Sequence, residues 1–204
     1  MNKQKALLQL KELKKHAHPD MRLAAENWSK PWQSLVSTML SARTRDEVTI
    51  VVCNKLFKKY KTPYALARAP LKDVQKMIYS VNFYKNKSKN IKHCAQILAA
   101  QYRGNPPHNF EKLIHLPGVG RKTANVFLSE MGKSTIGVDT HVFYISRKLG
   151  WTKSKNPEQI EEDIKTLFDK KYWRSVNPTL VRFGRTHQSR RLKNALLDKI
   201  KKIA

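Results

Sequence analysis

The sequence predicts an all-α fold. Apolar residues recur at helical spacing over most of the chain, strand-like alternation is scarce, and no internal repeat or low-complexity linker interrupts the pattern. The chain has 204 residues, of which 40% are hydrophobic, so it can bury a core as one domain or as two small ones. We expect roughly nine to twelve helices.

Apolar stripes place these helices along the chain. The first follows Leu7–Leu13, and the second follows Trp32–Leu40 with Pro31 in its first turn. Asp46 is expected to cap a third helix that runs to Phe57. Further helices are expected over residues 71–78, 91–98, 110–114, 121–128, 142–149, 160–168 and 188–204.

Charge is the strongest signal in the composition. Lys and Arg number 41 against 15 Asp and Glu, which gives a net charge of +26. A chain this basic repels itself unless it binds a polyanion. Nucleic acid fits better than an anionic membrane, because the charge is spread along a chain that also carries a folded core. A generic solubility charge is the alternative.

The cysteines and the N-terminus indicate the compartment. Cys53 and Cys94 lie far apart in apolar helical patterns and form no C-x-x-C pair, so neither a zinc ribbon nor a redox motif is supported. We expect two buried free thiols in a reducing compartment. The N-terminus enters an amphipathic helix, and no apolar run is long enough to cross a bilayer. We therefore expect an intracellular, cytoplasmic protein with no membrane partner.

The most informative stretch, Leu116–Ala124, reads Leu-Pro-Gly-Val-Gly-Arg-Lys-Thr-Ala. Two short helices joined by Pro-Gly-x-Gly form a helix-hairpin-helix, which we place at about residues 110–130. Gly118 and Gly120 permit positive φ, so backbone N–H groups at the start of the next helix can bind a DNA phosphate. An ordinary glycine-capped turn is the alternative. The expected phosphate-binding residues are Gly118, Val119, Gly120, Arg121 and Thr123.

This string resembles the hairpin of the endonuclease III family of base-excision DNA glycosylases. The segment Val138–Phe143 resembles that family's aspartate segment, and the likeness extends from the N-terminal helix through Arg185. In family members that also cleave the DNA strand, the residue matching Lys122 is the lysine nucleophile. The resemblance therefore implies that Lys122 and Asp139 are catalytic, and that His141 and Arg185 contact DNA.

The implied chemistry explains these residue types. An amine can attack the anomeric carbon of a sugar and form a Schiff base, which allows β-elimination of the 3′ phosphate. A phosphate-binding lysine is the alternative for Lys122. Asp139 would stabilise positive charge on the sugar or help to deprotonate Lys122. The alternative for Asp139 is a helix N-cap, and the two roles are compatible.

Two further positions match family residues that enter the opened base stack. Arg43 stands where the family carries a glutamine that fills the space left by the flipped base; a surface arginine is the alternative. Phe83 lies in a loop whose apolar tip would wedge into the stack. A core aromatic is the alternative, but Lys85 and the lysines at 87 and 89 favour a DNA-facing loop.

The C-terminus departs from the family pattern. Many members carry four cysteines there that hold a [4Fe–4S] cluster, whereas here Gln188 stands near the place of the first and no cysteine follows. A cluster needs thiolates, so we expect no metal and no cofactor. We expect a basic helix from Arg190 to pack in the cluster's place. Tyr144 also replaces a residue that is often arginine.

By resemblance, the architecture is two helical lobes with a DNA cleft between them: residues 23–133, and residues 1–22 with 134–204. We expect a monomeric base-excision glycosylase with AP lyase activity. Its substrate would be double-stranded DNA with damaged bases, by default oxidised pyrimidines, or abasic sites. The alternatives are a glycosylase for another lesion or mismatch, a non-catalytic helix-hairpin-helix protein, and a basic RNA-associated protein. The presence of both Lys122 and Asp139 favours the enzyme, because phosphate binding requires neither.

Overall fold

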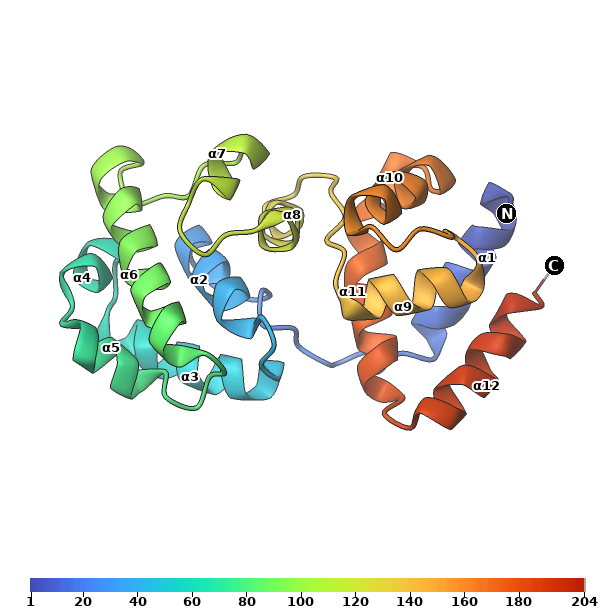
Figure 1. Ribbon diagram of the computed structural model, residues 1–204, viewed down its shortest axis with the longest axis horizontal. Coiled ribbons are helices and arrows are strands. Elements are labelled where there is room, and N and C mark those ends of the chain that lie inside the picture. Colours follow the sequence, from blue (N-terminus) through green and yellow to red (C-terminus); the bar gives the residue numbers. More distant parts are fainter. Residues whose placement is uncertain (204) are drawn as a thin grey trace. The chain divides into compact units, whose positions relative to one another are not determined.

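The computed structural model describes residues 1–203; Ala204, the last residue of the expected second lobe, lies outside the described residues. Residues 1–203 form α-helices, one short 3₁₀-helix and no strand, which confirms the all-α expectation (Figure 1). No helix in this range combines the length and the apolar character needed to cross a membrane. In chain order the helices are α1 (Lys3–Lys15), α2 (Pro31–Ser41), α3 (Asp46–Lys59), α4 (Pro63–Arg68), α5 (Leu71–Met77), α6 (Tyr84–Gln101), α7 (Phe110–Ile114), α8 (Arg121–Glu130), α9 (Thr140–Leu149), α10 (Pro157–Leu167), η1 (Lys170–Tyr172), α11 (Trp173–Thr186) and α12 (Arg190–Lys201).

Several helices differ from the expectation. The sequence pattern did not predict α4 or α11, and α11 contains Pro178, which removes a backbone donor and makes the segment look broken. Asp46 is the first residue of α3 rather than its cap, which is Arg45. A carboxylate in the first turn still complements the positive end of the helix dipole. Helix α6 begins at Tyr84, so Lys85 and the lysines at 87 and 89 lie on a helix and not in a loop.

The chain divides into two compact units, residues 22–131 and residues 1–21 with 132 onward. The expected division, at 22/23 and 133/134, lies one and two residues from these limits. Each unit has its own apolar core.

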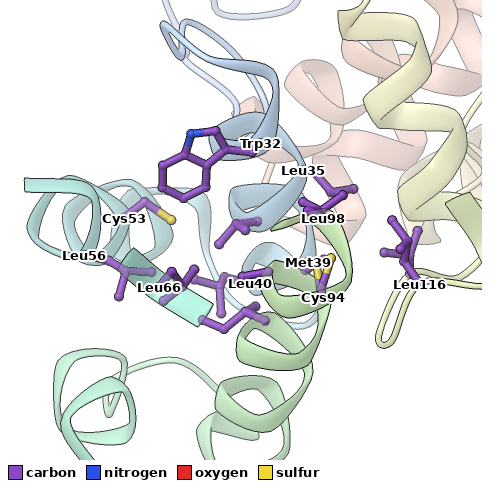
Figure 2. Packing of buried hydrophobic residues seen from close by; sticks show 14 of the residues in the cluster. Trp32, Leu35, Met39, Leu40, Cys53, Leu56, Leu66, Cys94, Leu98 and Leu116 are labelled. Carbon is purple, nitrogen blue, oxygen red and sulfur yellow. The ribbon is translucent and has the colours of Figure 1, made fainter. Parts of the chain in front are cut away.

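Buried residues from α2 to α8 form the core of the unit of residues 22–131. Figure 2 shows the packing of some of them, among them Trp32, Cys53 and Cys94. Trp32 is 2% exposed, and its ring meets that of Phe57 edge-on with centroids 4.9 Å apart. Cys53 and Cys94 are buried free cysteines, as expected. Burial raises the pKa of both thiols to about 12, so they remain protonated at neutral pH.

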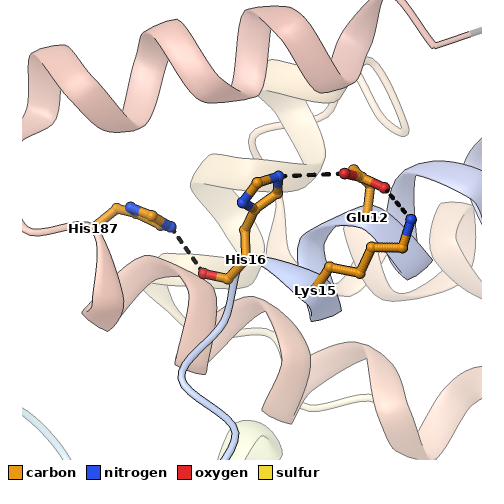
Figure 3. A network of polar contacts seen from close by, with 4 residues as sticks. All are labelled: Glu12, Lys15, His16 and His187. Atoms are coloured by element: carbon orange, nitrogen blue, oxygen red, sulfur yellow. Dashed lines mark hydrogen bonds and ion pairs between the residues drawn. The ribbon is translucent and has the colours of Figure 1, made fainter.

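The second unit packs α1 and α9–α12 around another core, in which Leu197 and Ile200 of α12 are buried. The end of α1 is held by polar contacts (Figure 3). Glu12 pairs with Lys15 at 2.9 Å and with His16 at 3.3 Å, and the Lys15 hydrogen bond, the largest cause, lowers the pKa of Glu12. Nε2 of His187 lies 2.9 Å from the His16 carbonyl oxygen, which joins the end of α1 to the end of α11.

The expected helix-hairpin-helix is present as α7, a turn and α8, and its two glycines differ. Gly118 has φ +78°, and a Cβ there would lie 2.8 Å from Cβ of Asn90 on α6. Gly120 has φ −92°, and nothing lies within 4 Å of an added Cβ. Only the first glycine uses positive φ, and it also lets the turn approach α6 closely.

Gly118→Ala should therefore destabilise the protein by about 1–3 kcal/mol, because it combines a left-handed backbone with overpacking. Gly120→Ala is the matched control and should stay within about 0.5 kcal/mol of the parent. Urea unfolding of the three proteins measures the difference. Equal stability of the two variants would contradict this account of the turn.

Candidate active site

The first turn of α8 follows the Pro-Gly-x-Gly turn of the helix-hairpin-helix directly. Gly120 is its N-cap, with an extended backbone and no side chain over the helix end. An α-helix leaves its first N–H groups without intrahelical partners and carries a partial positive charge there. The Arg121 guanidinium carbon lies 5.1 Å from the ring centroid of Phe110, which ties this turn to α7. The arrangement is suited to a phosphate held by backbone amides.

Two of the expected phosphate-binding residues face inward. Val119 is 4% exposed and its N–H donates to the Leu116 carbonyl at 3.0 Å. Thr123 is 7% exposed. We therefore expect Val119 to shape the turn, and the amides from Gly120 onward to meet an anion.

Lys122 lies in the same first turn and is half-buried. Its charge acts on a second lysine of the same unit, Lys87 of α6. Burial lowers the pKa of Lys87 to about 8, and the charge of Lys122 contributes to the same shift. The candidate nucleophile therefore shares its surroundings with another amine from a different helix.

Arg43 and Phe83 lie together on the surface of the same unit. Phe83 is 55% exposed, so it is not a core aromatic. Its φ is +60° and that of Arg43 is +57°, a backbone region that bulky residues rarely occupy. The guanidinium carbon of Arg43 lies 4.9 Å from the Phe83 ring centroid, in cation–π geometry. Lys85 is exposed nearby in the first turn of α6.

Asp139 is the N-cap of α9 in the other unit. Its Oδ1 accepts hydrogen bonds from the N–H groups of His141 and Val142, both at 2.9 Å. Both bonds use one oxygen, which leaves Oδ2 for another partner. The cap holds the carboxylate in a fixed orientation, which a catalytic group requires.

Two contacts with α11 fix the segment around Asp139. Asn177 is 9% exposed and its side-chain amide donates to the Gly137 carbonyl at 2.7 Å, two residues before Asp139. The ring of His141 lies against Gly184, where an added Cβ would come within 2.1 Å of Nδ1. Any residue larger than glycine at position 184 would therefore clash with the imidazole. Arg185, half-buried, follows it on α11.

The structure sorts the candidate residues by unit. The unit of residues 22–131 holds the hairpin residues with Lys122, together with Arg43, Phe83 and Lys85; the other unit holds Asp139, His141 and Arg185.

The residues present do not fit a [4Fe–4S] cluster. Both cysteines are thiols buried in the core of the unit of residues 22–131, and the C-terminal segment has none. Among residues 1–203 no group of three His, Cys, Asp or Glu side chains is placed to hold a metal ion.

Tyr144 donates from its hydroxyl to Oδ1 of Asn194, so it joins α9 to α12.

Sequence reasoning missed four supporting residues. Asn82 precedes Phe83 but carries no local signal of its own, and Lys87 was considered only as one of a run of lysines. Asn177 and Gly184 lie on α11, whose proline hid the helix. An apolar stripe would have revealed α11: Val176, Leu180, Val181 and Phe183 are all buried.

Comparison with known proteins identifies the family. Residues 36–170 match the model of the HhH-GPD superfamily of base excision DNA repair proteins. The chain is 44% identical over 156 residues to endonuclease III of Thermotoga maritima, which covers 76% of this chain and 73% of the relative. Endonuclease III of Escherichia coli K12 is 34% identical over 187 residues, or 91% and 87% of the two chains.

A solved structure agrees in fold. It is described as a trapped covalent intermediate of endonuclease III with DNA, in an estranged-adenine complex. It matches with a TM-score of 0.85 and 33% identity, over 93% of this chain and 89% of that one. The chain belongs to the endonuclease III family of the HhH-GPD superfamily.

Proposed function

We propose that this chain is a base-excision-repair DNA glycosylase with AP lyase activity, acting on double-stranded DNA that carries damaged bases or abasic sites. One observation carries the proposal: a half-buried lysine, Lys122, lies in the first turn of α8 directly after the hairpin. The endonuclease III relatives support the activity, and the relative described as a trapped covalent DNA intermediate supports a covalent route.

In the proposed reaction the neutral amine of Lys122 attacks the anomeric carbon of the damaged nucleotide. The glycosidic bond breaks, its electron pair leaves with the base, and the base takes up a proton. The bond between the anomeric carbon and the ring oxygen then breaks, the ring oxygen takes up a proton, and the nitrogen loses its remaining proton, which gives a Schiff base. Removal of a proton from the adjacent sugar carbon then expels the 3′ phosphate by β-elimination. Water hydrolyses the imine and releases Lys122.

Asp139 supplies a negative charge for the same reaction. A carboxylate stabilises the positive charge that develops on the sugar as the base departs, and it can take the proton from the attacking amine. Because Oδ1 is engaged in capping α9, the proposed role falls to Oδ2.

Arg43 and Phe83, called the wedge pair below, would enter the base stack when the damaged nucleotide is flipped. Their exposure and their contact with each other support this role. Flipping costs a few kcal/mol of unstacking, less for a damaged base, and an inserted side chain offsets part of that cost. By the family resemblance we propose oxidised pyrimidines as the substrate; a cleavage panel over defined lesions tests this and would identify another lesion or a mismatch.

Lys122→Gln should abolish strand cleavage and borohydride cross-linking to abasic DNA, because glutamine cannot form the imine. DNA binding should survive, since the hairpin amides are unchanged. Lys76→Gln removes the same charge from the exposed face of α5 and should leave both activities intact. Undiminished cross-linking by Lys122→Gln would point to a different amine.

Asp139→Asn separates the cap from the charge. Asparagine caps helices as well as aspartate does, so the melting temperature should hardly change. Turnover should fall by a factor of about 10² or more, the scale expected for a positioned charge or acid–base group. Single-turnover cleavage and thermal unfolding are measured together. Unchanged turnover with an intact fold would leave Asp139 as a cap alone.

Phe83→Ala and Lys85→Ala should act on different steps. Each phosphate contact contributes about −0.9 to the slope of log affinity against log salt. Lys85→Ala should reduce that slope by about one contact. Phe83→Ala should leave it unchanged and lower single-turnover cleavage, because it removes a wedge and no charge. Binding of an uncleavable abasic analogue at several salt concentrations measures the slopes. Parental cleavage by Phe83→Ala would exclude the wedge role.

A further inference from the structure

The side chain of Lys87 reaches from α6 to the end of α2. Its ammonium donates to the carbonyl oxygens of Leu40, at 2.7 Å, and Ala42, and lies 3.4 Å from the hydroxyl oxygen of Thr44. One amine thus contacts three successive parts of the chain where α2 ends and the Arg43 loop, residues 42–45, begins.

Lys87 satisfies carbonyl groups at the C-terminal end of helix α2. The last carbonyls of a helix lack intrahelical donors and carry a partial negative charge. The last turn of α2 contains no basic residue. Lys87 supplies the missing cation from another helix, and it does so where the backbone turns into the left-handed conformation of Arg43.

Asn82 holds the same loop from the other side. Its side-chain amide donates to the carbonyl oxygen of Arg43, and its backbone N–H donates to the Thr44 hydroxyl at 3.1 Å. Phe83 follows Asn82 directly, and its ring lies under the Arg43 guanidinium. The two loops that carry the wedge pair are therefore linked through backbone atoms and through the side chains themselves.

Placing the Lys87 ammonium there carries an energetic cost. Burial first, and then the charge of Lys122, lower the pKa of Lys87 to about 8. A half-buried amine retained against desolvation and repulsion needs compensating acceptors. The Leu40 and Ala42 carbonyls and the Thr44 hydroxyl provide them.

We propose that Lys87 and Asn82 are positioning residues that lock Arg43 and Phe83 into one preformed unit. The lock is a property of the free protein. Its consequence for catalysis rests on the proposed function: both side chains enter the base stack together, without a separate ordering step. Preorganisation of this kind raises the rate more than the affinity.

Hydrogen exchange tests the lock without DNA. Lys87→Met should accelerate amide exchange in residues 43–45 by about tenfold or more at Thr44, whose N–H donates to the Ser41 carbonyl at 2.9 Å. Lys92→Met is the matched control, because Lys92 lies on the same helix and donates to the Ala67 carbonyl at 2.6 Å. It removes the same charge and a similar contact, and should leave residues 43–45 unchanged. Asn82→Ala is a second test variant, because Asn82 is exposed and its replacement should not disturb folding. It should accelerate exchange in the same residues, and it keeps the test decisive if Lys87→Met folds poorly. Unchanged exchange in residues 43–45 of both test variants would overturn the proposal.

A double-mutant cycle tests the catalytic consequence. Lys87→Met should lower single-turnover cleavage by about tenfold, and Lys92→Met should stay within about twofold of the parent. If Lys87 acts through the wedge pair, adding Lys87→Met to Phe83→Ala should cost no more than about twofold further. Additive losses would show that Lys87 acts elsewhere, for example on Lys122, and would refute the inference. Failure of the parent to cleave would refute the proposed function and leave the exchange result standing.

Discussion

An α-helix leaves its first N–H groups and its last carbonyl groups unpaired, and the candidate functional residues of this chain gather at such ends. The hairpin glycines and Lys122 lie at the start of α8, Asp139 caps α9, and Phe83 precedes α6. Lys87 closes the end of α2. The same unpaired groups that must be satisfied for folding also supply the fixed dipoles that a phosphate, a cation or a catalytic carboxylate needs. Short helices are suited to this role because each one provides two helix ends from only a few residues.

The net charge of +26 surrounds these helix ends with many basic side chains. Most basic side chains are exposed. They attract a polyanion such as DNA through their summed charge, and this attraction does not depend on their exact positions. Lys87 differs, because its ammonium is half-buried and directed at carbonyl oxygens. The lysines at 85 and 89 on the same helix are exposed. The lysines at 85, 87 and 89 look alike in the sequence, but two of them are solvated charges and one has a structural role. Only their burial in the structure distinguishes the two kinds.

The sequence predicted what depends on local pattern and missed what depends on tertiary contact. Apolar periodicity located most helices, and the Pro-Gly-x-Gly string located the hairpin. Helix α11 is an exception: Val176 and Leu180 belong to an apolar stripe that indicates a helix, but Pro178 within the segment argues against one. Both hairpin glycines permit positive φ, but only Gly118 adopts it, and the sequence did not distinguish the two. The contact between Gly184 and His141 joins positions more than forty residues apart, and no local rule indicates it.

The geometry around Asp139 bears on the catalytic role proposed for it. A carboxylate that only capped α9 would meet its structural duty with one oxygen, as Oδ1 does here. The support around it exceeds what a cap requires. Asn177 anchors the chain before Asp139, and His141 is seated in a space that only a glycine on α11 leaves open. Such support adds little to the stability of a helix cap on the surface. For a carboxylate that stabilises positive charge in a transition state it matters directly, because moving the carboxylate lowers the reaction rate. The support of the residues before and after Asp139 therefore favours the proposed catalytic role over a role in helix stability alone.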